Sequence, residues 1–135
     1  MERYDIKILL ALREAIRGSK DFFHWLLDNG YPELAAFSNA IRGDRSAQEF
    51  LGRIGQAWLS VLSEAIDGEE RARHWVARNL HEVNIRFALA CRKEESAIRW
   101  LKERDLGIFL MLAQEVAVVL EVQATENAGP YVMKF

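Results

Sequence analysis

The sequence predicts an all-α protein, a solenoid of tandem helical hairpins with about four and a half repeats of 25 residues. The first observation is the pattern Ala-Ile-x-Gly, which occurs at 15–18, 40–43 and 65–68. A fourth copy begins in register at Ala90 but lacks the isoleucine and the glycine. A fixed period without insertions indicates that one supersecondary unit has been copied in tandem.

Two further columns repeat with the same period. Ten residues beyond each alanine stands an aromatic residue followed by an aliphatic one: Trp25-Leu26, Phe50-Leu51, Trp75-Val76 and Trp100-Leu101. The other column is made of large apolar residues: Leu12, Phe37, Leu62, Phe87 and Leu112. Because three columns share one period, the whole unit recurs rather than a single motif.

The first segment of each unit has the apolar spacing of a helix. Leu9, Leu12 and Ile16 are spaced i, i+3 and i+7, which places them on one helical face. The equivalent residues of later units are Leu34, Phe37 and Ile41, then Leu59, Leu62 and Ile66, then Phe109, Leu112 and Val116. Glycines at 18, 43 and 68 then end this helix, because glycine enters the left-handed region without a Cβ penalty.

The second segment of each unit also carries one apolar helical face, which in the first unit is Phe22, Trp25 and Leu26. In the later units the place of Phe22 is taken by small residues that allow close helix packing, Ala47, Ala72 and Ala97.

The start of this second helix has a capping pattern. Ser46 followed by Glu49 predicts a capping box, and Asp21 and Ser96 occupy the column of Ser46. Arg71 breaks that column, so we expect the third cap elsewhere.

Helices of about ten residues are not stable alone, so each hairpin is expected to bury its apolar face against its neighbours. Stacked hairpins would form a rod about 45 Å long. We therefore predict one helical-repeat domain over residues 1–124 and a C-terminal tail over residues 125–135.

Residues 15–30 resemble the helical part of an ankyrin repeat, with Ala15, the helix-breaking Gly18, an apolar second helix around Trp25 and the terminal Gly30. Ankyrin units are about 33 residues long and contain a β-hairpin loop, for which a 25-residue unit has no room. The later units also replace the glycines, with Lys93, Leu80 and Asp105. The resemblance implies a protein-interaction scaffold without catalysis.

Composition limits the possible partners. The chain has 18 basic and 20 acidic residues and a net charge of −2, so no global field recruits nucleic acid, an anionic membrane or an acidic substrate. The lone Cys91 excludes a disulfide framework, and with a charged N-terminus that lacks a signal-peptide pattern we expect a cytoplasmic protein. The apolar stretch 106–122 contains Glu115 and Glu121, and we expect it to be too short and too charged to span a bilayer.

No pattern of catalytic or metal-ligating residues is found. His24 and His74 share a repeat column, which predicts a solvated ladder, and His81 has no converging partner. Cys91 replaces the isoleucine of its column and is expected in the core. The tryptophans of the aromatic column are expected to be core residues, whereas Trp58 lies in a mixed column and is expected to be partly exposed. We expect no enzyme, no metal and no cofactor.

The C-terminal segment suggests an interface. Residues 108–120 are apolar nearly all round, Val118 replaces the helix-ending glycine, and no second helix follows. We therefore predict that this helix packs against a second copy of the chain. The interface residues expected are Phe109, Leu112, Val116, Val119 and Leu120, with Tyr131, Met133 and Phe135 from the tail. Alternatively, the tail folds back and shields its own helix.

These observations predict a non-enzymatic scaffold for protein–protein interaction, homodimeric and cytoplasmic. The alternative is a small nucleic-acid-binding or regulatory helical module that uses exposed arginines, namely Arg53, Arg71, Arg73, Arg78 and Arg99. A third possibility is an enzyme with a pocket between hairpins.

Overall fold

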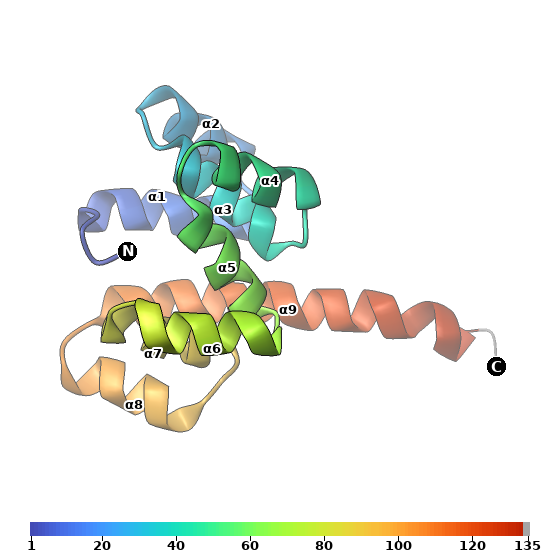
Figure 1. Cartoon of the computed structure of the whole chain (residues 1–135). Helices are drawn as coiled ribbons and strands as arrows, with labels where there is room; N and C mark the ends of the chain where they lie inside the picture. Colours follow the sequence, from blue (N-terminus) through green and yellow to red (C-terminus); the bar gives the residue numbers. More distant parts are fainter. Residues whose placement is uncertain (134–135) are drawn as a thin grey trace.

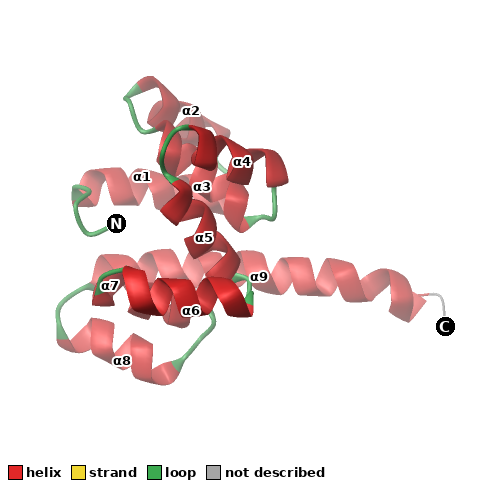
Figure 2. Cartoon of the chain, in the orientation of Figure 1, coloured by secondary structure: helices red, strands yellow, loops and turns green. Residues whose placement is uncertain are grey.

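The predicted all-α class is confirmed in the computed structural model, which describes the backbone of residues 1–133 and the side chains of residues 1–126. The described residues contain helices and no strand (Figure 2). The helices are α1 (Ile6–Arg17), α2 (Lys20–Asp28), α3 (Pro32–Ile41), α4 (Arg45–Arg53), α5 (Ala57–Ile66), α6 (Glu70–Asn79), α7 (Glu82–Cys91), α8 (Glu95–Glu103) and α9 (Gly107–Met133).

The starts of the helices follow the period of the sequence. Helices α3, α5, α7 and α9 begin at positions 32, 57, 82 and 107, so each starts one full period after the last. Helices α2, α4, α6 and α8 begin at positions 20, 45, 70 and 95, with the same spacing. The columns of the sequence therefore fall at equivalent places on successive helices.

The odd-numbered helices contact one another in a closed cycle. Each of α1, α3, α5 and α7 packs against the even-numbered helix that follows it and against the next odd-numbered helix. The last odd-numbered helix, α9, also packs along α1 (Figure 1). In a straight rod with layers about 10 Å apart, these two helices would be about 40 Å apart. The expectation of an extended rod is therefore wrong, because the first and last helices pack against each other.

The predicted apolar face of the odd-numbered helices is confirmed as the core. All three columns are buried in α1, α3, α5 and α9, for example Leu12, Phe37 and Leu112. In α7 the column of Leu9 is occupied by Asn84, which is also buried. Its Oδ1 accepts a hydrogen bond of 3.1 Å from the amino group of Met1, and burial lowers the pKa of that amino group to about 6.

The aromatic column is a correction to the sequence analysis. The aliphatic residue of each pair is buried, as Leu26 and Leu101 show, whereas the aromatic residue before it is half-buried in three pairs and exposed in the fourth. Trp75 is 38% exposed, and the ring of Trp100 lies beneath the guanidinium of Arg104 at 4.1 Å. Adjacent residues of a helix point about 100° apart, so only one of the two can face the odd-numbered layer.

Phe22 is also exposed, contrary to the face predicted for the second helix. The small residues in its column are buried as expected: Ala47, Ala72 and Ala97.

The helix caps lie two residues before the positions predicted. Ser19, Asp44 and Glu69 are the N-caps of α2, α4 and α6, and the side chain of each accepts a hydrogen bond from a backbone N–H of the first turn. Ser46 is therefore inside α4 and does not form the expected capping box with Glu49. The turn after each odd-numbered helix is shorter than we expected. The N-cap of the next helix is the residue directly after the left-handed glycine, as in Gly43-Asp44.

Left-handed backbone recurs where glycine has been lost. Gly18, Gly43 and Gly68 have positive φ, and Lys93 in the same column has φ 65°. In the column of Gly30 and Gly55, Asp105 has φ 57°. The packing of the hairpins therefore imposes this conformation on residues that do not favour it.

The helix α9 closes the cycle through an ion pair as well as apolar contacts. The carboxylate of Glu115 lies 3.6 Å from Nη2 of Arg13 and 3.6 Å from Nε of Arg17, both on α1. The Glu115 side chain is 19% exposed and that of Arg13 28%, whereas the Arg17 side chain is 51% exposed. The pair with Arg13 is therefore the better shielded of the two.

The helix α9 continues beyond the predicted range 108–120. It runs through Thr125 to Met133, so the expected boundary between domain and tail at residue 124 is not a helix end.

Replacing Asp105 with glycine is expected to raise the free energy of unfolding by about 0.5–1 kcal/mol, because glycine adopts positive φ without a Cβ penalty. Chemical denaturation measures the change. The reverse exchange at the equivalent position, Gly55→Asp, is the control and should lower the free energy of unfolding by a similar amount. An unchanged or less stable Asp105→Gly variant would contradict the idea that the backbone is strained there.

The substitution Glu115→Gln is expected to lower the free energy of unfolding by about 1 kcal/mol, because it removes the carboxylate of α9 that pairs with Arg13 and Arg17, although Glu14 of α1 remains within ion-pair distance of both. The matched control is Glu121→Gln, which removes an exposed ion pair with Lys93 and should cost about 0.5 kcal/mol or less. Equal effects of the two substitutions would show that the closure does not depend on Glu115.

Candidate binding groove

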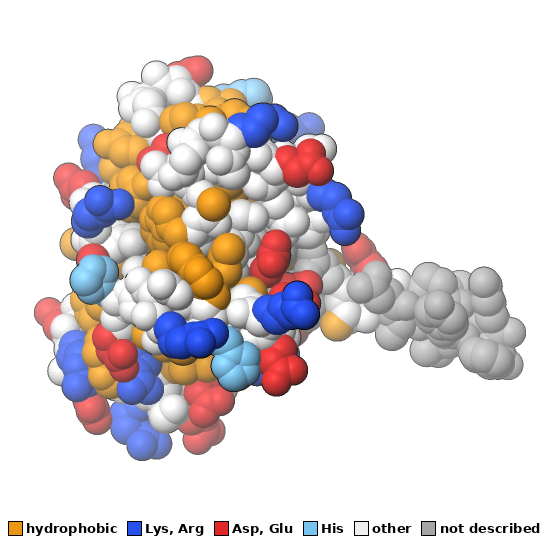
Figure 3. Space-filling view, in the orientation of Figure 1, with side chains coloured by type: hydrophobic (Ala, Val, Ile, Leu, Met, Phe, Trp, Pro, Cys, Tyr) orange, Lys and Arg blue, Asp and Glu red, His pale blue; other side chains and the backbone are white. Residues whose placement is uncertain are grey.

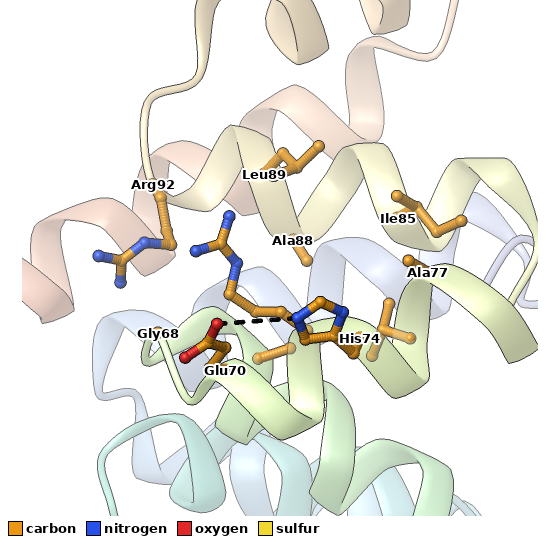
Figure 4. Close-up of a pocket in the computed structure, with 11 residues that line it drawn as sticks. Gly68, Glu70, His74, Ala77, Ile85, Ala88, Leu89 and Arg92 are labelled. Atoms are coloured by element: carbon orange, nitrogen blue, oxygen red, sulfur yellow. Dashed lines mark ion pairs between the residues drawn. The ribbon is translucent and has the colours of Figure 1, made fainter.

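A groove of about 540 Å³ lies between α6 and α7. Its walls are apolar, from Val76 and Ala77 on α6 and from Ile85, Ala88 and Leu89 on α7. Polar side chains from Glu70, Arg73, His74 and Arg92 complete its lining. Figure 4 shows apolar side chains of α7 facing α6, with Glu70 and His74 on the α6 side and Arg92 at the end of α7.

The link between α6 and α7 explains why this groove is open. The other links between an even-numbered helix and the next odd-numbered one contain a left-handed residue, namely Gly30, Gly55 and Asp105. Here α6 ends at Asn79 and is followed by Leu80 in an extended conformation, with φ −104° and ψ 159°. Helix α6 consequently packs less closely on α7 than α2 does on α3 or α4 does on α5.

The charged side chains of the groove are held in different ways. Nη1 of Arg92 donates a hydrogen bond of 3.0 Å to the carbonyl oxygen of Ile66, at the end of α5. Nε2 of His74 lies 3.8 Å from Oε1 of Glu70, and both side chains are exposed. Arg73 has no carboxylate within ion-pair distance among the described residues.

The same groove recurs at two other places in the chain. Between α2 and α3 there is a hollow of about 470 Å³. Its lining includes Ala15, Gly18, Phe23, His24, Asn39 and Arg42, whose positions are each two periods before Ala65, Gly68, Arg73, His74, Leu89 and Arg92. A smaller hollow of about 310 Å³ lies between α8 and α9, with most of its lining one period after that of the α6–α7 groove. Sequence reasoning missed these grooves, although the recurrence of His24 and Arg42 at 74 and 92 was a signal for them.

Arg42 and Arg92 have the same structural role. Each lies at the C-terminal end of an odd-numbered helix and donates a hydrogen bond to a carbonyl in the preceding odd-numbered helix, Arg42 to Ile16 and Arg92 to Ile66. Those carbonyls lie in the last turn of a helix, where no intrahelical donor is left for them. Asp67 stands one period after Arg42 and one period before Arg92 in the sequence. Its side chain has no N–H donor, so it cannot donate the equivalent hydrogen bond to α3.

The described residues contain no group of three side chains that could hold a metal ion. His24, His74 and His81 are all exposed. Cys91 is buried as predicted, and burial raises the pKa of its thiol. Trp58 is partly exposed as predicted, and its Nε1 donates a hydrogen bond of 2.8 Å to Oε1 of Gln56.

The expected interface on α9 is divided by the structure. Phe109, Leu112 and Val116 are buried in the core of the same chain, because they face α1 and α7 as their columns predict. Val119 and Leu120 are half-buried. Tyr131, Met133 and Phe135 lie outside the residues whose side chains are described.

Two exposed valines on α9 were missed in the sequence analysis. Val118 is 53% and Val122 50% exposed. Val118 occupies the column in which glycines end the earlier helices, so the helix continues here where the others turn. The replacement of the helix-ending glycine by Val118 was the feature of the sequence that could have predicted this exposed apolar segment.

Helix α9 is long and apolar enough to cross a membrane by length and composition. The segment Gly107–Glu126 has a mean hydropathy of 1.6 over its most apolar window, and 28% of that window is buried within the chain. The expectation that this stretch is too short was wrong, because the helix extends beyond residue 122.

The arginines considered for nucleic-acid binding are exposed. Arg71, Arg73 and Arg78 lie on α6, Arg53 lies on α4 and Arg99 on α8. Figure 3 shows basic and acidic side chains interspersed on the visible face, without a large region of one sign.

No family model, curated protein or solved structure matches this chain.

Replacing Gly68 with alanine is expected to cost about 1 kcal/mol more in unfolding free energy than the substitution Gly43→Ala. Both glycines have positive φ, but a Cβ at Gly68 would lie 3.1 Å from Nη1 of Arg92, whereas at Gly43 nothing lies within 4 Å. The Arg92 guanidinium would have to shift by a few tenths of an ångström, which strains its hydrogen bond to the Ile66 carbonyl, and loss of such a bond costs about 1 kcal/mol. A double-mutant cycle tests the cause: in an Arg92→Ala background the extra cost at Gly68 should disappear, and its persistence would refute this explanation.

Proposed function

We propose that this protein is a non-enzymatic scaffold for protein–protein interaction, built from tandem helical hairpins whose first and last helices close on each other. The constant spacing of the helix starts and the equivalent burial of their columns support the repeat. The recurring grooves support a binding role, because successive units present the same surface with different side chains. The observation that carries the proposal is the exposed apolar segment of α9 beyond Ala117.

The first partner proposed is a second copy of the chain. The C-terminal part of α9 extends past the other helices (Figure 1). Before it, Val118 and Val122 are exposed while Val119 and Leu120 are half-buried. A helix with apolar side chains on several sides gains stability when another helix covers it. Two copies related by a two-fold axis can bring the same segments together, which buries both at once.

Insertion of α9 into a bilayer is a less favourable use of the same segment. Phe109, Leu112 and Val116 lie in the same apolar segment and form part of the core. Inserting the whole segment would remove these side chains from α1 and α7 and would also break the ion pairs of Glu115. Packing of two projecting segments leaves the core intact. A cytoplasmic location is part of the same proposal.

The substitution Val118→Asp is expected to convert a dimer into a monomer, because it places a charge in the centre of the proposed contact. Size-exclusion chromatography with light scattering measures the mass. At micromolar concentration the unmodified chain should have the mass of two chains, and the variant should have the mass of one.

The matched control is Ile54→Asp, which adds the same charge at an exposed apolar residue after α4 and should leave the mass unchanged. Circular dichroism should show equal helical content in all three proteins. If the unmodified chain has the mass of a monomer, the proposed dimer is contradicted. Co-flotation of that monomer with lipid vesicles would favour membrane insertion instead. A steeply salt-dependent shift of DNA or RNA mobility would favour the nucleic-acid alternative.

A further inference from the structure

We propose that the α6–α7 groove binds a segment of a partner protein in which large apolar side chains are flanked by carboxylates. The apolar side chains would occupy the groove between the helices, and the carboxylates would pair with Arg73 and Arg92. This inference rests on the proposed scaffold function and names the chemistry of its partner.

The walls of the groove supply the apolar part of this recognition. Ala77 and Ala88 are small, so they leave space between α6 and α7 that Ile85 and Leu89 line with apolar surface. A volume of about 540 Å³ lies in the range of natural ligand sites and holds a few apolar side chains. An occupant would remove this surface from water, which is the main source of affinity in such contacts.

The rim supplies a charge opposite to that of the whole molecule. The chain has a net charge of −2, yet the groove is lined by two arginines, a histidine and one carboxylate. The carboxylate, Glu70, lies 3.8 Å from Nε2 of His74 and is not within ion-pair distance of Arg73. Arg92 is held in place by the Ile66 carbonyl, which uses one of its five N–H groups and leaves the others for a carboxylate.

The equivalent hollows show the same excess of basic side chains. The α2–α3 hollow is lined by Lys20, His24 and Arg42 and by no carboxylate. The α8–α9 hollow has Lys93 and Lys102 with the single carboxylate Glu121. All three grooves thus have more basic than acidic side chains, although Lys93 of the α8–α9 hollow is paired with Glu121. This excess on an acidic chain complements an acidic partner.

A partner protein fits the groove better than a free small molecule does. Small-molecule sites usually enclose most of the ligand surface. Here Glu70, Arg73 and His74 are exposed, so the groove is open to solvent on the side of α6. An open groove can accept side chains that project from a larger chain, whose backbone stays outside.

The test uses three capped tetrapeptides with isotopically labelled full-length protein: Ac-Glu-Leu-Phe-Glu-NH₂, its Gln-Leu-Phe-Gln counterpart and its Lys-Leu-Phe-Lys counterpart. Amide shifts in nuclear magnetic resonance spectra report both the site and the affinity. The acidic peptide should shift amides of α6 and α7 and should bind about tenfold more tightly than the lysine peptide, with the glutamine peptide between them. Its affinity should fall as salt is raised, because the charged contacts are at the surface.

Two substitutions locate the contact. Arg73→Glu should weaken binding of the acidic peptide about tenfold or more, because it reverses a charge at the rim. Arg78→Glu is the matched control, an exposed arginine on the same helix outside the groove lining, and should change the affinity less than about twofold. Ala77→Phe should block the groove and abolish the α7 shifts at unchanged helical content.

Equal affinity for the acidic and lysine peptides, shifts confined to other helices, or equal effects of Arg73→Glu and Arg78→Glu would each overturn this inference. Its failure is separable from failure of the proposed scaffold, because dimerisation through α9 is measured without peptide and involves no residue of the α6–α7 groove. A stable dimer that ignores all three peptides would retain the scaffold and reject the groove.

Discussion

The packing of α9 against α1 is the constraint on which the arrangement of the other helices depends. Successive odd-numbered helices each contact the next, and the last contacts the first, so every odd-numbered helix has two neighbours in its own layer. Glu115 joins Arg13 and Arg17 across this contact. Helices of about ten residues gain most of their stability from such packing. An open array would leave the apolar faces of α1 and α9 without partners, whereas the closed cycle covers both with one contact.

Closure also sets what is left for binding. Apolar side chains in the first part of α9, such as Leu112 and Val116, are buried in the core. The most exposed large apolar side chains of the described part of α9 are Val118 and Val122. The remaining spaces lie at the C-terminal ends of the odd-numbered helices beside α9 and within individual hairpin units, where the same positions line a groove in several units. The α6–α7 groove differs from its equivalents because Leu80 is extended where the other links have a left-handed residue. A local change in one link thus loosens the packing of α6 on α7, and the hollow there is larger than its two equivalents.

The sequence predicted the buried face of the odd-numbered helices but misjudged the even-numbered ones. Trios such as Leu34, Phe37 and Ile41 have strong helical spacing and bury as expected, since burial of large aliphatic side chains dominates the energetics. Trp75 and its aliphatic neighbour Val76 are both apolar, and spacing alone does not say which faces the core. Capping was misplaced for a similar reason, because both Asp44 and Ser46 are good caps and the length of the turn decides between them.

The sequence by itself determined the helical class, the period of the helices and the core of the inner layer, because these follow from local spacing and from glycines that end helices. Only the tertiary structure decided that α1 packs against α9, that a groove forms between α6 and α7, and that Lys93 and Asp105 adopt a left-handed backbone conformation. The contact of α1 with α9 depends on how all the helices between them pack, and the groove and the left-handed residues depend on packing between neighbouring helices. These contacts join residues of different helices, so no local pattern encodes them.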